Sequence, residues 1–518
     1  MTAAVQEAPP APPPPPARQR RLCTADVVAG LSVALVLIPQ SLAYAELAGM
    51  PPERGLYAST IALLVAAPLA SSPYLQTGPV AVTALLTFGA LSTQAPPGSD
   101  EYVALGLLLA VVVGAVRIAV GALRAGVIAY LMSQPMLIGF IPAAALLILS
   151  SQLPNATGAD APDGSVVERA AWAVAHPGSW ELAAVLMTLA AIALILGGRR
   201  VHPLFPGILV AVVAATAVSE LAGYSGVVVG EIPVGAPPVS VDLPFGELGA
   251  LLVPGVIIAI VGFAEPASIA RRFAAEDRDR WDADREFVSQ GAANVAAGLS
   301  GGFPVGGSFS RSSLNRLAGG RSRWSGAVTG LAVLAVLPVV FLLEPLPKAM
   351  LGAVVIAAVL PLLRLGAFAE LWARSKPAFL IAAATFAATI AFEPHVERGV
   401  LAGVALSVAV HLWRELRLDL ACWRDGSTLH ARPSGVLWFG VAQALEERLL
   451  AVLADEPDVD RLVVHLDAVG RFDITAAMAL RAAFEHARAG GVAPELADVQ
   501  ERDRRLTVMV QPPDAGVP

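Results

Sequence analysis

The sequence has few of the residues on which metalloproteins and disulfide-linked proteins depend. Two of its 518 residues are cysteine, and Asp, Glu, Lys and Arg together make up 15%. Cys23 and Cys422 have a spacing that suits neither a disulfide framework nor a metal site. The seven histidines are scattered without the spacing of metal ligands. We therefore expect no metal, no cofactor and no catalytic residues.

The small amount of charge excludes further classes of protein. The net charge of −7 changes sign along the chain instead of forming one basic face, which argues against nucleic-acid binding. Hydrophobic residues make up 56% of the sequence, and the mean hydropathy is +0.67. The composition is too apolar for an ordinary soluble protein, so most of the chain is expected to lie in a lipid bilayer.

The first 21 residues differ from the rest. The run Pro12 to Pro16 is a polyproline tract that cannot pack into a core, so residues 1–21 are predicted to be a disordered cytoplasmic tail. Arg18, Arg20 and Arg21 before an apolar stretch imitate a signal peptide. That stretch is long enough to span a bilayer, however, and more spans follow it.

Apolar runs separated by Gly, Pro and charged residues predict fourteen transmembrane segments, seven in each half of residues 22–418. About 20 apolar residues are needed to cross about 30 Å of hydrocarbon. The predicted spans lie near 25–48, 54–71, 79–93, 102–122, 129–152, 179–197, 203–223, 250–270, 286–302, 308–318, 324–343, 347–363, 377–392 and 396–416.

The distribution of basic residues predicts that both termini are cytoplasmic, because short cytoplasmic loops carry an excess of Lys and Arg. The even-numbered loops are basic, and hold Arg124, Arg199, Arg200, Arg271, Arg272, Arg278, Arg280, Arg285, Arg321, Arg323, Arg364, Arg374 and Lys376. The odd-numbered loops are acidic, with Asp100, Glu101, Asp160, Asp163, Glu231, Asp242 and Glu247 against Arg54, Arg169, Lys348 and Arg398.

After Leu418 the pattern changes to short strands and amphipathic helices, which predicts a small soluble α/β domain over 425–512, followed by a tail at 513–518. "LVVHL" at 462–466 is a strand candidate, and a helix is expected from about Thr475 to Arg488. "GVLWFG" at 435–440 is a buried-strand candidate before a helix near 442–453. The stretch from Glu501 onward is too polar to assign.

Two predicted spans are short in the same way. "QTGPVAVTALL" and "FPVGGSFSRSS" each open with Gly and Pro and leave about 10 to 15 helix-compatible residues, or about 15 to 22 Å. Each is the third span of its half, which is the arrangement expected for two inverted repeats. Helix N-termini that face each other at the membrane midplane present N–H groups and positive dipole ends, and so predict an anion site.

Polar residues near these two breaks are candidate binding residues. Ser308 and Ser310 supply hydroxyl donors, and Arg311 adds a positive charge that is costly in lipid without a function or a partner. The alternative for Arg311 is that it reaches the cytoplasmic surface. Gln40 and Tyr44 lie four residues apart on one helix face after Pro39, where they either line the same cavity or hold helices together.

Glu265, in "VGFAEPASIA", is an acid inside an apolar span. Such an acid is usually functional, and a carboxylate facing the site would bind Na⁺ or take up a proton. The alternative is a structural acid that pairs with Arg311 or caps a helix.

Four sequence blocks resemble the sulfate permease (SulP) family of anion transporters. They are "IPQSLAYAELAGMPPERGLYAS" at 38–59, "TGPVAV" at 77–82, "EFVSQGAANVAAGLSGGFPVGGSFSRSS" at 286–313, and "FDITAAMALRAA" at 472–483. The resemblance implies seven plus seven spans in inverted repeats, a core domain that moves against a gate domain, a C-terminal STAS domain and a homodimer. It also implies that the anion lies between the third and tenth spans.

The resemblance assigns roles to particular residues. Glu265 falls where related bicarbonate carriers place a Na⁺-binding aspartate and where related sulfate carriers place a glutamate tied to proton coupling, so glutamate here favours protons. The implied binding residues are Gln40, Tyr44, Val80, Ala81, Ser308, Phe309, Ser310 and Arg311.

The sequence departs from the family pattern at two loops. Arg54 stands where an aromatic residue is common, and "SSPYLQTGP" at 71–79 lacks the usual basic residue. Thr475 occupies the position at which related anti-sigma antagonists carry a phosphorylated serine. It is therefore a candidate phosphorylation site, with a helix N-cap beside Asp473 as the alternative.

The resulting hypothesis is a multi-pass transporter of the inner membrane that moves a small anion, sulfate first, by proton symport and alternating access. Bicarbonate and dicarboxylates remain open as substrates, because helix N-termini recognise negative charge more than identity. Na⁺-coupled bicarbonate symport, anion exchange, a channel and a nucleobase carrier of the same fold remain alternatives. So does a signalling protein in which the STAS domain, whose partner is unknown, is the output.

Overall fold

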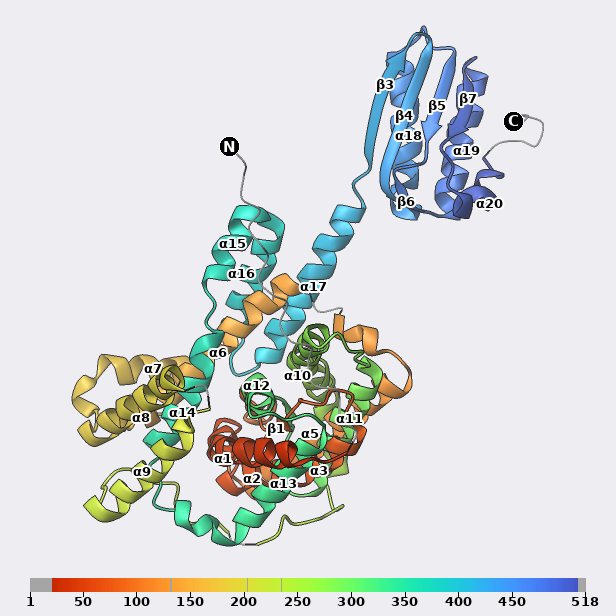
Figure 1. Cartoon of the computed structure of the whole chain (residues 1–518). Helices are drawn as coiled ribbons and strands as arrows, with labels where there is room; N and C mark the ends of the chain where they lie inside the picture. Colours follow the sequence, from red (N-terminus) through yellow and green to blue (C-terminus); the bar gives the residue numbers. More distant parts are fainter. Residues whose placement is uncertain (1–20, 131–132, 203, 234, 511–518) are drawn as a thin grey trace, which may run out of the picture. The chain divides into compact units, whose positions relative to one another are not determined.

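The computed structural model describes residues 21–130, 133–202, 204–233 and 235–510, so the predicted tails lie outside the described residues apart from Arg21. The chain forms two compact units, Met1–Val404 and Ala405–Pro518. Figure 1 shows a helical unit and a smaller unit that contains a sheet.

The N-terminal unit is helical. Its first half contains α1 (Thr24–Leu47), α2 (Pro52–Ala58), α3 (Ile61–Leu69), α4 (Ala81–Leu91), α5 (Asp100–Ala122), η1 (Gly126–Tyr130), α6 (Gln134–Thr157), α7 (Val166–Ala175), η2 (Pro177–Ser179), α8 (Leu182–Val201) and α9 (Gly207–Ala222). Its second half contains η3 (Phe245–Glu247), α10 (Leu248–Glu276), α11 (Ala283–Leu299), α12 (Phe309–Leu317), α13 (Trp324–Val336), η4 (Leu337–Leu343), α14 (Lys348–Val359), η5 (Leu360–Leu362), α15 (Gly366–Arg374), α16 (Lys376–Ala391) and the start of α17 (Val396–Glu415).

These helices form two packed groups, which we call the core group and the gate group. The core group consists of α1–α5 and α10–α13, and the gate group of α6–α9 and α14–α16. Each half of the chain therefore contributes its earlier helices to one group and its later helices to the other. Figure 1 shows α7, α8 and α9 gathered on one side, away from α3, α5 and α11. This is the arrangement expected for two repeats.

Seven described helical segments are long and apolar enough to cross a membrane: Thr24–Leu47, Asp100–Ala122, Gln134–Thr157, Phe245–Glu276, Trp324–Leu343, Lys348–Arg374 and Val396–Glu415. Shorter apolar helices are Ala81–Leu91, Leu182–Gly198, Gly207–Ala222 and Lys376–Ala391. A polytopic helical membrane fold is thus confirmed, while the count of fourteen spans stays a prediction.

The helices differ from the predicted spans at three places. The span predicted near 54–71 is divided into α2 and α3 at Ser59 and Thr60, whose hydroxyls donate to backbone carbonyls one turn earlier. Helices α7 and α15 were not predicted. Both are short and amphipathic, so an apolar-run criterion does not detect them.

The C-terminal unit is a mixed sheet covered by helices. Its elements are β3 (Asp419–Asp425), β4 (Thr428–Leu437), α18 (Phe439–Asp455), β5 (Arg461–His465), β6 (Val469–Phe472), α19 (Ile474–Ala489), β7 (Ala493–Ala497), η6 (Glu501–Asp503) and α20 (Arg504–Thr507). The strand order is β3-β4-β5-β7, and β6 pairs with β4. β3 is antiparallel to β4, whereas β5, β6 and β7 join by parallel pairing.

One face of this sheet packs on α18 and α19. Alternate residues of β4 and β5, such as Leu429, Ala431, Leu462 and Val464, are buried in one core with both helices. The strand predicted at 435–440 was wrong in its second half. β4 ends at Leu437, and Phe439 already begins α18, because the Asp473 carboxylate accepts a hydrogen bond from the Phe439 N–H at this helix start.

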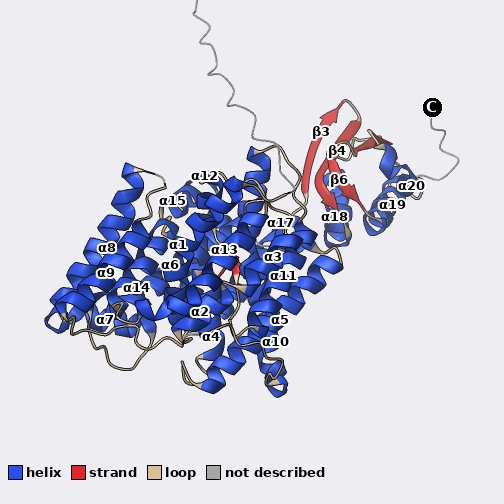
Figure 2. Cartoon of the chain, turned by 60° about the horizontal axis from the view of Figure 1, so that its bottom comes forward, coloured by secondary structure: helices blue, strands red, loops and turns tan. Residues whose placement is uncertain are grey.

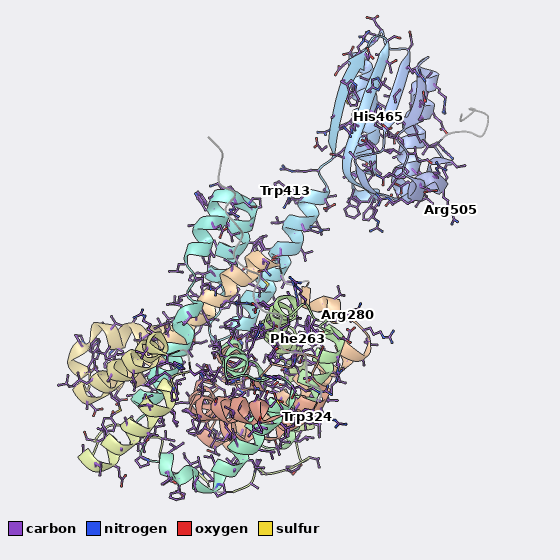
Figure 3. The ribbon with its side chains drawn as sticks, viewed as in Figure 1. Phe263, Arg280, Trp324, Trp413, His465 and Arg505 are labelled. Carbon is purple, nitrogen blue, oxygen red and sulfur yellow. The ribbon has the colours of Figure 1, made fainter. Side chains whose placement is uncertain are left out.

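The other face carries a ring cluster. The Trp423 ring stacks on the rings of His430 and His465, whose Nδ1 and Nε2 atoms are 3.0 Å apart. His465 Nδ1 lies 2.7 Å from an Asp498 oxygen. Figure 3 labels His465 on the sheet. The three stacked rings lie on the adjacent strands β3, β4 and β5, one ring on each strand.

Asp26 ties the start of α1 to the start of α13. Its buried carboxylate accepts hydrogen bonds from Arg321 N at 2.7 Å, Ser322 N at 2.8 Å and Ser322 Oγ at 2.7 Å. The same carboxylate accepts from the Cys23 N–H and thiol, so Asp26→Ala removes the acceptor of five donors and is expected to lower the free energy of unfolding by about 3 kcal/mol. Thermal melting of the purified protein measures this loss. Asp242→Ala, at an exposed position, is the control, and equal melting of the two variants contradicts the role of Asp26.

Candidate anion site

The two short spans meet inside the helical unit. The residues before them pair as β1 (Thr77–Gly78) and β2 (Gly306–Gly307), an antiparallel bridge with Thr77 opposite Gly307 and Gly78 opposite Gly306. Figure 2 shows a small red strand segment among the blue helices of this unit. The N-termini of α4 and α12 therefore lie next to each other, as the sequence predicts.

Local sequence explains why both helices begin so late. Gly78 has φ of 149°, a conformation that favours glycine, and Pro79 after it disfavours a helical residue at position 78. A Cβ atom at Gly307 would lie 2.7 Å from Leu75 Cδ1, so the bridge needs a residue without a side chain there. The helices then start at Ala81 and Phe309, with Val80 and Ser308 as N-caps.

A buried polar network fixes the bridge from behind. Gln76 N donates to Ser312 Oγ at 3.0 Å, and Gln76 O accepts from Ser308 N at 3.0 Å. Gln290 of α11 donates to Thr77 Oγ1 at 2.7 Å. Asn294 bonds both the N–H and the carbonyl of Val305, at 2.9 and 3.0 Å.

No role was predicted for Gln290 and Asn294 from the sequence. The available signal was that these two amides lie four residues apart, on one face of α11.

A cavity of about 340 Å³ lies against these helix starts. One wall belongs to the core group and contains seven predicted site residues: Tyr44, Val80, Ala81, Glu265, Ser308, Phe309 and Ser310. The facing wall belongs to α8, α9, α14 and the segments beside them, and it was not predicted. It contains Ile195, Phe205, Gly207, Ile208, Ala358, Val359, Pro361 and Leu362. This wall is apolar, so nothing in its composition distinguishes it from other membrane helices.

Arg311 and Gln40, the other two predicted residues, lie on the lining helices α12 and α1 but do not themselves line the cavity. Arg311 Nη1 donates to Gln40 Oε1 at 3.3 Å. The Arg311 side chain is fully buried, so the alternative in which it reaches the membrane surface is wrong. Within the described chain, Arg311 Nε, Arg311 Nη2 and Gln40 Nε2 have no hydrogen-bond partner. Buried donors of this kind are costly unless a ligand satisfies them.

Glu265 lies at the start of α12. Its Oε1 atom accepts a hydrogen bond from Phe309 N at 3.0 Å, so the carboxylate caps the helix that carries Arg311. Of the two structural alternatives for Glu265, capping is thus observed. No ion pair within 4 Å joins it to Arg311 in the described structure. Because Glu265 also lines the cavity, capping and a role toward a ligand coexist at this position.

The donors at the cavity are suited to an oxyanion. Ser308 Oγ accepts from Arg311 N at 3.5 Å and lies 3.3 Å from Ser310 Oγ, so one of the two hydroxyls donates to the other and the second hydroxyl hydrogen is available at the cavity. Two helix N-termini add N–H groups and positive dipole ends. This region therefore combines neutral donors, dipoles and one buried cation, the features of a candidate site for a small anion in a membrane carrier.

Comparisons with known proteins agree with this class. Residues 23–385 match the sulfate permease family, and residues 424–511 match the STAS domain. The chain is 39% identical over 402 residues to a probable sulfate transporter of Mycobacterium tuberculosis, covering 75% of this chain and 70% of that protein. It is 30% identical over 395 residues to the chloroplastic sulfate transporter 4.1 of Arabidopsis thaliana, covering 74% and 57%.

Solved structures share the fold. Murine solute carrier 26 family member A9, an anion transporter in the inward-facing state, has a TM-score of 0.87 at 21% identity, covering 94% of this chain and 87% of that one. The transmembrane domain of the cyanobacterial bicarbonate transporter BicA has a TM-score of 0.64 at 23% identity, covering 75% and 98%. The chain belongs to the sulfate permease family and is a multi-pass membrane anion transporter with a C-terminal STAS domain.

Thr475 lies in the STAS domain, as the second residue of α19, and is exposed. It is not the N-cap that we considered. Asp473 caps α19 instead and accepts a hydrogen bond from Ala476 N at 2.8 Å.

Arg311→Gln removes the buried charge while keeping a polar side chain. We expect sulfate affinity to fall by at least about tenfold, because a charge-assisted hydrogen bond contributes about 1.5 to 3 kcal/mol. The sulfate-dependent rise in melting temperature measures the affinity. Arg321→Gln, at an exposed position one loop away, should bind as the wild type does; unchanged binding in Arg311→Gln would place the site elsewhere.

Proposed function

We propose that this protein is a secondary active transporter that takes up sulfate together with protons. The observation that carries the proposal is the buried Arg311, whose Nε and Nη2 atoms lack partners in the described structure, beside two helix N-termini and a cavity of about 340 Å³. The residues that hold the anion are Gln40, Tyr44, Val80, Ala81, Ser308, Phe309, Ser310 and Arg311.

Sulfate is the first substrate to test for two reasons. Relatives of this chain in bacteria and in plants are named sulfate transporters or probable sulfate transporters. A tetrahedral dianion also offers four oxygens to the serine hydroxyls, the helix N–H groups and the guanidinium. Bicarbonate and dicarboxylates share the negative charge and are the competing outcomes of a substrate panel.

Alternating access follows from the two walls of the cavity. The polar wall lies on the core group and the apolar wall on the gate group, so a movement between the groups exposes the anion without dismantling its donors. One ion pair already crosses between the groups, where Lys348 Nζ of α14 lies 3.1 Å from Glu46 Oε1 of α1. Its making and breaking would accompany this movement.

Glu265 is the proposed coupling group. As a carboxylate it places a negative charge at the start of α12, where it competes with the anion for the Phe309 N–H. Protonation removes this charge and weakens the competing hydrogen bond. Proton binding and anion binding therefore favour each other, which is the thermodynamic requirement for symport.

The remaining proposals concern assembly and regulation. The basic loops favour an inner-membrane protein with both termini in the cytoplasm. The homodimer is proposed from the family resemblance alone. Thr475 is the proposed phosphorylation site of the STAS domain, because its exposed position in the first turn of α19 allows a phosphate to meet the positive end of the helix dipole.

Uptake into proteoliposomes tests substrate and coupling. Labelled sulfate should accumulate when the external medium is more acidic than the lumen, and an inward Na⁺ gradient alone should not drive it. Parallel uptake of bicarbonate and fumarate measures selectivity. Absence of sulfate uptake under either gradient contradicts the sulfate assignment, and accumulation driven by Na⁺ alone contradicts proton coupling.

Glu265→Gln separates coupling from binding. The amide keeps the size of the side chain but cannot exchange a proton, so pH-driven accumulation should be lost while downhill sulfate flux continues. Both are measured in the same proteoliposomes, with the exposed Glu247→Gln as the matched control. Full pH-driven accumulation by Glu265→Gln is the result that removes Glu265 from the coupling step.

A further inference from the structure

Arg117 is a buried arginine to which the site described so far gives no role. It lies within α5, between Val116 and Ile118, and its side chain is 0% exposed. Arg117 and Arg311 are the largest fully buried side chains of the described chain. An arginine inside a membrane helix is costly, so its position needs a physical reason.

The partners of Arg117 are all neutral. Its guanidinium donates to the carbonyls of Ala259 at 3.0 Å, Val305 at 2.9 Å and Ile258 at 3.4 Å. Within the described residues, no carboxylate oxygen lies within 4 Å of it. Each guanidinium nitrogen therefore has an acceptor, but the hydrogen bonds do not cancel the positive charge.

These bonds hold the elements that build the anion site. Ile258 and Ala259 precede Glu265 in α10, and Val305 precedes β2. Because Asn294 already bonds both the N–H and the carbonyl of Val305, the guanidinium completes a fixed connection between α5, α10, α11 and the bridge.

Gly262 brings the guanidinium close to the bridge. A Cβ atom at this position would lie 2.7 Å from Arg117 Nη2 and 2.9 Å from Thr83 Cγ2, so the guanidinium packs against the Gly262 backbone, with α4 beside it. A Cβ atom at Gly306 would in turn lie 3.5 Å from the Gly262 carbonyl oxygen. One layer of backbone thus separates Arg117 from β2.

We propose that Arg117 is a positioning residue for anion binding, which fixes α10 and β2 behind the site and adds an uncompensated positive charge there. The proposal rests on the anion site proposed above. The charge acts through buried protein, where Coulomb attraction for an anion is stronger than in water. The bonds keep the Glu265 carboxylate and the N-terminus of α12 at fixed positions.

Two substitutions of Arg117 separate its charge from its hydrogen bonds. Arg117→Gln keeps donors but removes the charge, and Arg117→Lys keeps the charge with fewer donors. In the full-length protein, Arg117→Gln should raise the dissociation constant and the KM for labelled sulfate about tenfold, with a smaller change in maximal rate. Arg117→Lys should restore affinity to within about twofold of the wild type. Equal sulfate affinity in Arg117→Gln and the wild type overturns the proposal, as does an equal loss in both variants.

A second variant tests the charge with Arg117 in place. Asn294→Asp puts a carboxylate beside the carbonyl that Arg117 binds, supplies the missing counter-charge, and should lower sulfate affinity even where Arg117→Gln fails to fold. Unchanged affinity in Asn294→Asp also overturns the proposal. The matched control is Arg285→Gln, whose exposed arginine donates to the Leu69 carbonyl and should bind sulfate normally.

Arg311→Gln distinguishes a failure of the positioning role of Arg117 from a failure of the anion site itself. If Arg311→Gln loses sulfate binding and Arg117→Gln does not, the positioning role alone fails. If neither variant changes binding, the anion site itself has been misplaced.

Discussion

The antiparallel bridge between Thr77–Gly78 and Gly306–Gly307 is the constraint on which the helical unit depends. It lets two helices begin inside a membrane protein without leaving the preceding backbone unpaired in an apolar medium. Several polar residues support this pairing: Gln290 and Asn294 hold it from α11, and Ser308 closes it toward α12. The proposed anion site depends on the bridge, which fixes two helix N-termini side by side.

Two buried arginines show how this unit handles charge. The guanidinium of Arg117 donates to three backbone carbonyls, whereas the guanidinium of Arg311 donates only to Gln40 among the described residues and keeps two nitrogens without a partner. Burial alone therefore does not mark a binding residue. The two guanidinium groups differ in their hydrogen-bond partners. Every nitrogen of the Arg117 guanidinium has an acceptor within the protein, whereas two nitrogens of Arg311 need a ligand to supply one. The cavity lies beside the incomplete one.

The sequence predicted the parts of the site that depend on local chemistry. Glycine and proline placed before Val80 and Ser308 revealed the two short helices, and the serines and Arg311 after the second break indicated an anion. It did not predict the roles of Arg117 or Asn294, whose partners arise only when distant segments fold together, as with Arg117 and Val305 at a separation of 188 residues. The apolar wall around Phe205 and Pro361 was also missed, since an apolar lining has no signature in an apolar sequence.

The bridge also has a consequence for the synthesis of the protein. Gln76 and Ser312, which hydrogen-bond across it, are separated by 236 positions in the chain. When β1 leaves the ribosome, its partner strand has not yet been translated, so the first half cannot complete its own pairing. The polar segment around β1 must therefore remain unpaired in the nascent chain until residues 306–312 have been synthesised. A chain truncated between the halves would keep this polar segment without its partner.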